Sequence, residues 1–149
     1  MKLELDISIY PGDYNAAELH ISFRAGNFSG EGRGWLRMAE LDNFSKAIKK
    51  FPLGEEPYPC LAAGVWNEAA TELVQEHLYF KVSPEGARGA VRFLVRLAVP
   101  DDSAAADGIA FSASANIRTN YEMLREMADA LASLADGDAS EIKLVFPVD

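Results

Sequence analysis

The sequence predicts an α+β fold in which two helices pack on a mainly antiparallel sheet of six to seven strands. Several short segments alternate apolar and polar residues, which is the period-two pattern of half-buried strands. Two other segments repeat apolar residues at spacings of three and four, as amphipathic helices do. Short turns join most of the predicted strands, and this order favours antiparallel pairing over the long crossovers of a parallel sheet.

Size and composition predict one globular domain over residues 1–149. The chain is 49% hydrophobic and 25% charged, which is ordinary for a folded protein and excludes disordered or low-complexity classes. Glu4 and Asp6 lie where a signal peptide would carry its apolar segment. No uncharged apolar stretch reaches the about 18 residues of a membrane span. We therefore expect a soluble, cytoplasmic protein.

The first part of the chain predicts three strands and a helix. Alternation predicts strands over residues 3–9, 19–25 and 35–39. The glycine-rich segment 26–34 predicts a hairpin connection between the last two. An apolar stripe at helical spacing predicts a helix over residues 41–51, with Asp42 near its start and lysines near its end. Pro52 would end this helix.

The remainder predicts a similar order of elements. Residues 52–75 contain three prolines and show no clear pattern, so a strand, a lid or a loop all stay open there. Strands are predicted over residues 78–82, 91–99, 109–115 and 142–146. A helix is predicted over residues 121–135, with Thr119 and Glu122 as a capping box and Gly137 after its end. Three strands and a helix thus occur twice before a last strand, and an internal duplication remains open.

Charge restricts the class of partner. The formal net charge is −9, and the acidic residues are spread evenly along the chain. Nucleic-acid binding requires a basic face, so we expect none. The densest basic cluster, Lys46, Lys49 and Lys50, falls at a predicted helix C-terminus, where cations are favourable. An acidic surface suits a basic partner, although it also confers solubility.

No motif in the sequence predicts catalysis, a metal or a cofactor. The segment Gly30-Glu31-Gly32-Arg33-Gly34 lacks the helix N-terminus that a phosphate loop needs directly after its glycines. The only histidines, His20 and His77, are too few for a zinc site. Cys60 lies in an apolar setting that predicts a buried, inert thiol. We therefore expect a protein that is not an enzyme and needs no cofactor.

Four residues are candidates for contact with a partner. Trp35 and Trp66 fall outside the clear core stripes, and exposed aromatic residues often anchor protein interfaces. The alternative is that both fold back over a small core. Asp101 and Asp102 lie in an acidic loop, where aspartates also favour turns through local hydrogen bonds.

The order of elements resembles a known bacterial family. Trp35-Leu36 leads into a helix with Leu41, Phe44 and Ile48, and a later Gly-Ala-Val-Arg-Phe-Leu-Val strand precedes a second helix. This pattern resembles the WapI-type immunity proteins and related small bacterial domains, over most of the chain. The resemblance implies a non-enzymatic protein that binds and neutralises a secreted toxin. The dispersed acidity suits a basic toxin domain.

Two functions from different classes follow from these patterns. The first is a non-enzymatic protein-binding module, immunity-like if the resemblance holds. The alternative is a small-molecule-binding protein or minor enzyme with a pocket between sheet and helices, where His77, Glu76 and Arg96 would converge. A homo-oligomer formed through an edge strand also remains open.

Overall fold

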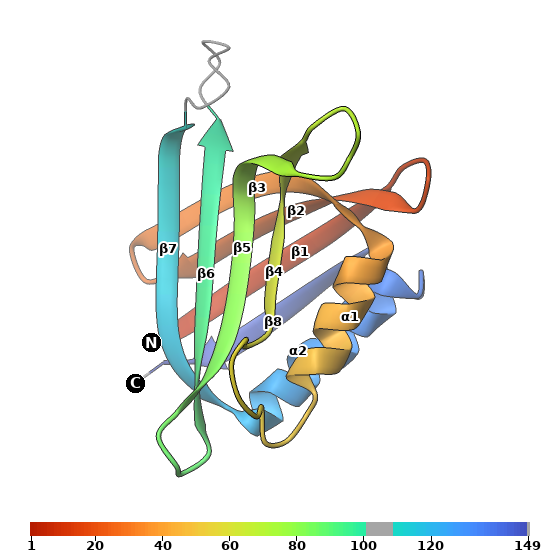
Figure 1. Ribbon diagram of the computed structural model, residues 1–149. Helices are drawn as coiled ribbons and strands as arrows, with labels where there is room; N and C mark the ends of the chain where they lie inside the picture. The colour runs from red at the N-terminus through yellow and green to blue at the C-terminus, as the bar shows by residue number, and fades with distance from the viewer. Residues whose placement is uncertain (101–108, 149) are drawn as a thin grey trace.

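A computed structural model describes residues 1–100 and 109–148, which form a curled antiparallel sheet with two helices at its open side (Figure 1). The strands are β1 (Lys2–Pro11), β2 (Ala16–Ala25), β3 (Phe28–Arg37), β4 (Cys60–Trp66), β5 (Leu73–Glu85), β6 (Ala90–Pro100), β7 (Ile109–Asn120) and β8 (Glu141–Pro147). The helices are α1 (Met38–Ile48) and α2 (Tyr121–Ala135). The predicted α+β class with an antiparallel sheet is confirmed.

The predicted count of six to seven strands and the repeated three-strand order are wrong in detail. The sheet has eight strands, in the order β7-β6-β5-β4-β3-β2-β1-β8. Residues 60–66 supply the additional strand, β4, so that four strands rather than three separate the helices. β4 pairs with β5, and its register shifts between Ala63 and Gly64. This irregularity breaks the period-two pattern by which a strand is recognised in a sequence.

The glycine-rich segment 26–34 is mostly strand and not a hairpin connection. Only Gly26 and Asn27 form the turn, and β3 pairs with β2 from Phe28 to Arg37. A Cβ added to Gly30 would lie 2.5 Å from the Cβ of Ala113 in β7, and one on Gly34 would lie 2.6 Å from the backbone nitrogen of Gly64. The glycines therefore permit a close approach of backbones rather than a flexible loop.

The sheet folds over on itself where β3 leaves β4. Among the described residues, β3 pairs with β4 only at Trp35↔Gly64. Beyond this pair the two halves, β4–β7 and β3-β2-β1-β8, face each other across the core (Figure 1). The ring of Phe93 in β6 joins the halves by contacting that of Phe146 in β8, with centroids 5.3 Å apart, and it also contacts Phe80 of its own half at 5.4 Å. The helices lie side by side, and α2 connects edge strand β7 to edge strand β8.

The ends of the helices differ in part from the predicted ones. α1 begins at Met38, and its N-cap residue Arg37 makes no side-chain cap hydrogen bond. Asp42 instead forms an ion pair with Lys46 at 2.8 Å. The cap of α2 is Asn120, whose side chain accepts a hydrogen bond from the backbone of Met123 at 2.9 Å. The predicted cap, Thr119, is buried at the end of β7.

Two further expectations concern the end of α2 and the membrane. Gly137 follows α2 with φ +80°, as the predicted helix stop requires. Of the described helices, neither is long and apolar enough to cross a membrane.

We expect Gly34→Ala to destabilise the protein by about 3 kcal/mol, because the new methyl group would overlap the backbone of β4. The control is Gly86→Ala in the β5–β6 turn, where a Cβ would meet open space and only the left-handed backbone (φ +67°) adds a penalty of about 1 kcal/mol. Urea denaturation measures both free energies of unfolding. Equal losses in the two variants would contradict the close contact.

Candidate binding groove beside strand β3

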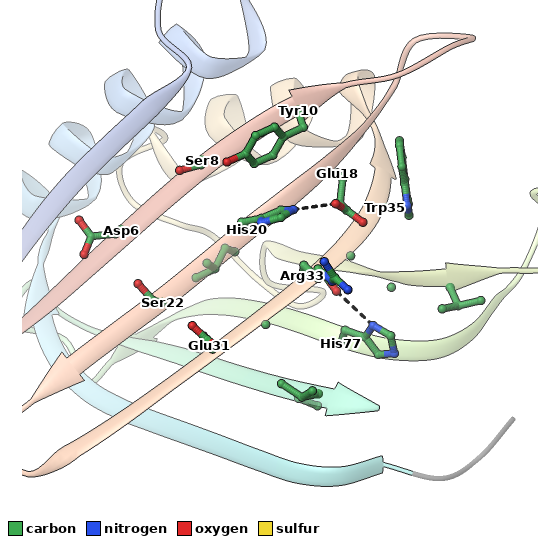
Figure 2. A pocket seen from close by; sticks show the side chains of 17 residues that line it. Asp6, Ser8, Tyr10, Glu18, His20, Ser22, Glu31, Arg33, Trp35 and His77 are labelled. Atoms are coloured by element: carbon green, nitrogen blue, oxygen red, sulfur yellow. Dashed lines mark hydrogen bonds and ion pairs between the residues drawn. The ribbon is translucent and has the colours of Figure 1, made fainter. Parts of the chain in front are cut away.

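A groove of about 740 Å³ lies where β3 separates from β4, and we call it the β3 groove (Figure 2). One wall is the polar face of β1, β2 and β3. The other wall comes from β4, β5 and β6, with Val65, His77 and Val99 among its residues. Its volume falls within the range of about 300–1,000 Å³ that is usual for ligand sites.

Strand register gathers the polar side chains of the first wall. Alternation sends Leu19 and Ile21 into the core, so their neighbours along β2 face outward. Pairing across three strands then aligns three rows, which are Tyr10–Glu18–Trp35, Ser8–His20–Arg33 and Asp6–Ser22–Glu31. All nine side chains line the groove. Acidic residues outnumber basic ones there, because Arg33 is the one arginine or lysine among its lining residues in the described part of the chain.

Glu18 holds the ring of His20 at the middle of this wall. Nε2 of His20 lies 2.6 Å from Oε1 of Glu18, and the ring of Tyr10 packs 4.4 Å from the imidazole (Figure 2). Within the described residues, Nδ1 of His20 has no hydrogen-bond partner. The His20 side chain is 38% exposed, so this nitrogen is available to a bound molecule as a hydrogen-bonding group or a proton acceptor.

His77 and Trp66 stabilise the place where the strands part. Nδ1 of His77 donates to the carbonyl of Arg33 at 3.1 Å, and Nε1 of Trp66 donates to the carbonyl of Trp35 at 2.7 Å. Nε2 of His77 lies 2.6 Å from the side-chain oxygen of Gln75. Both carbonyls belong to β3 near the single pair with β4. The two side chains therefore replace hydrogen bonds that a longer β3–β4 ladder would supply.

Two of the four predicted partner-binding residues, Trp35 and Trp66, lie within the described part of the chain. Trp35 lines the groove and is 41% exposed. Trp66 is half-buried and contacts the backbone of Trp35, so these two residues are brought together. Asp101 and Asp102 lie outside the described residues. The alternation of residues 19–25 puts His20 on the polar face of its strand, but no pattern in the sequence singles out Tyr10 or Glu18. Only the pairing register unites these residues.

Other polar residues do not meet as expected. Glu76 pairs with Arg96 at 3.3 Å, and Arg96 lies 4.4 Å above the ring of Tyr79, whereas His77 contacts β3. Cys60 is exposed rather than buried, because it precedes the buried Leu61 in an alternating strand. Burial raises the pKa of Tyr79, and the neighbouring Cys60 contributes in the same direction.

A second ionic cluster lies on the outer side of β5, β6 and β7, away from the groove. The Glu85 carboxylate accepts from Arg92 and from Arg118, at 2.8 Å in each case. The hydrogen bond from Arg118 has the largest effect on the pKa of Glu85 and lowers it, burial opposes this, and Arg92 lowers it further, so that the pKa lies below its usual value. This cluster carries a net positive charge, in contrast to the groove.

We expect Glu85→Gln to weaken the fold at neutral pH and to match the wild type in acid. Because the folded-state pKa of Glu85 is lowered, its contribution is complete above the ordinary value of 4.5 and is lost as the pH falls through the folded-state value. Urea unfolding between pH 7 and pH 2.5 measures the difference. Glu126→Gln on the exposed surface of α2 is the control. A gap between wild type and Glu85→Gln that stays constant with pH would refute the ion-pair assignment.

Comparison with known proteins adds no family to this geometry. No protein-family model matches the chain, and no curated protein is significantly similar to it.

Proposed function

We propose that the protein is a non-catalytic protein-binding module and that its partner docks in the β3 groove. The observation that carries this proposal is the pairing of a polar wall with an apolar one. Tyr10 and Trp35 are exposed aromatic residues on the first wall, and Val65 and Val99 are exposed on the second. Aromatic side chains beside polar groups are the usual anchors of protein interfaces.

The charge of the groove favours a basic partner. Asp6, Glu18 and Glu31 line it against the single guanidinium of Arg33, and the whole chain has a net charge of −9. Opposite charge on a partner would accelerate association and orient the approaching surface. A toxin-neutralising, immunity-like role toward a basic toxin domain agrees with this charge and with the resemblance to the WapI-type immunity proteins.

Binding fits the groove better than catalysis does. His20 lies on an open wall, and its bond to Glu18 orients the ring without enclosing it. The thiol of Cys60 lies outside the groove. General acid–base catalysis profits from a site that excludes water, where charges interact strongly.

We expect Trp35→Ala to weaken partner binding by about 30-fold, as the loss of an interface hot spot does. Tagged wild-type protein first captures partners from native lysate, and the captured protein is then purified and titrated calorimetrically. Phe51→Ala is the matched control, because Phe51 is an exposed aromatic residue outside the groove. Circular dichroism and thermal melting establish that both variants fold.

Two outcomes would overturn the proposal. One is that no protein is captured in stoichiometric amount by the folded wild type. The other is that the captured protein binds wild type, Trp35→Ala and Phe51→Ala equally, which would place the contact elsewhere.

The second candidate function is small-molecule binding or minor catalysis at His20, and the Glu18–His20 hydrogen bond favours it. A hollow of about 470 Å³ lies between α1 and β4, but none of the described residues that line it is a histidine, so the β3 groove is the place for a ligand of His20. A compound present at 100 times its Kd should stabilise the wild type by about 2.7 kcal/mol and His20→Gln much less. A thermal-shift screen measures this. Equal stabilisation of both proteins by every hit would exclude His20 as the ligand contact.

A further inference from the structure

One edge of β3 is unpaired along most of its length. The edge toward β2 pairs from Phe28 to Arg37 without interruption. The opposite edge forms a single pair in the described part of the chain, Trp35↔Gly64. In the described part of the chain, the stretch 28–33 therefore has a backbone edge that pairs with no strand, although it lies in the interior of the strand order and β5, β6 and β7 cross close to it.

The direction of one carbonyl shows which groups of this edge are free. The carbonyl of Arg33 accepts from His77, which lies on the side away from β2. Alternate residues of a strand direct their backbone groups to the same side, so those of Ser29 and Glu31 also point away from β2. Among the described residues, neither Ser29 nor Glu31 has a backbone partner on that side. Such a row of donors and acceptors is a template for another strand.

The free edge borders the β3 groove. Glu31 and Arg33 line the groove from β3 (Figure 2). Val65 and Val99 line it from the opposite wall. Side chains of an added strand would alternate between two environments. Those on the outer face would lie beside Glu31 and the Glu18 row, and those on the other face would meet the exposed valines.

We propose that the partner enters the β3 groove as an extended segment that adds a strand to the free edge of β3. This inference rests on the proposed function and specifies its partner. Charge complementarity with Asp6, Glu18 and Glu31 selects basic side chains on one face of the segment. The valines of the opposite wall select apolar side chains on its other face. The recognised segment therefore alternates basic and apolar residues, and main-chain hydrogen bonds contribute affinity.

The outer edge strand β8 is less suited to this role. It is short, carries Glu141 and Lys143, and ends at Pro147, which are features that block strand addition. The free edge of β3 also has charged side chains beside it. Its unpaired stretch, however, contains two residues without side chains, Gly30 and Gly32.

Three synthetic peptides test the proposal directly. The first has the sequence Lys-Val-Lys-Val-Lys-Val-Lys with blocked ends, the second is N-methylated at alternate amides, and the third has Glu in place of Lys. Calorimetric titration of the full chain should show binding of the first peptide. N-methylation, which removes main-chain donors, and reversal of charge should each weaken binding at least tenfold.

Variants of β3 provide the matched controls. Glu31→Pro removes a charge and the free N–H, whereas Glu31→Gln removes only the charge, so Glu31→Pro should bind the Lys-Val peptide at least tenfold more weakly than Glu31→Gln. Ser29→Pro removes an N–H and leaves every charge in place, and it should also bind at least tenfold more weakly than wild type. Neither N–H serves the β2–β3 ladder, and thermal melting verifies folding. Amide exchange should show protection of Glu31 when the peptide binds.

Each contrary result overturns strand addition. These results are no binding of the Lys-Val peptide, equal binding by Glu31→Pro and Glu31→Gln, and protection of β7 amides instead of Glu31. The proposed function is judged separately, by the Trp35→Ala and Phe51→Ala titrations with the captured protein. If a partner requires Trp35 but binds Ser29→Pro and Glu31→Pro as well as it binds the wild type, the groove remains the binding site and strand addition is excluded.

Discussion

The contact between the backbones of β3 and β4 at Gly34 and Gly64 determines the shape of this protein. No side chain can replace the hydrogen of Gly34, because its Cβ would overlap the backbone of Ala63 and Gly64 in β4. A Cβ on Gly64 would overlap the carbonyl of Gln75 in β5, so this position is crowded on its other side as well. The approach lets the sheet fold over at a single ladder pair, so that its two halves enclose one core. The same fold-over exposes an edge of β3 and opens the groove beside it. Core, groove and free edge are three results of one contact.

The two outer faces of the molecule differ in charge. The groove wall on β1, β2 and β3 is acidic, and the cluster around Glu85 on β5, β6 and β7 is basic. The net charge of −9 does not show this difference, because the basic cluster is small and its arginines pair with Glu85. A basic partner that approached the molecule would thus be directed to the groove rather than to the opposite face.

Much of the fold could be predicted from local patterns. Regular alternation revealed β1, β2 and β6, and the spacing of Leu124, Leu131 and their neighbours revealed α2. The segment of β4 was left open between strand, lid and loop, because its register shift at Gly64 interrupts the alternation. The glycines of β3 were interpreted as loop residues because their role, a close approach to strands far away in sequence, leaves no local signal.

The candidate site was less predictable than the fold. Alternation placed His20 outward, but the neighbours that define its chemistry come from register and not from sequence proximity. Tyr10 and Arg33 reach His20 only through pairing across β1, β2 and β3. The groove also depends on the separation of β3 from β4, which is a property of the folded sheet. Among the predicted candidates that the structure describes, Trp35 and His77 lie on its walls.

The two-residue turn at Gly26 and Asn27 has an evolutionary consequence. It fixes the pairing of β2 with β3, and a slip of this register by one residue would exchange every groove side chain of β3 with a core position. The register is therefore constrained there, whereas substitutions at the outward positions leave the interior untouched. The binding specificity of this surface could therefore change through single substitutions. Related proteins that bind different partners should differ in the outward side chains of β1, β2 and β3 and should keep the glycines of β3.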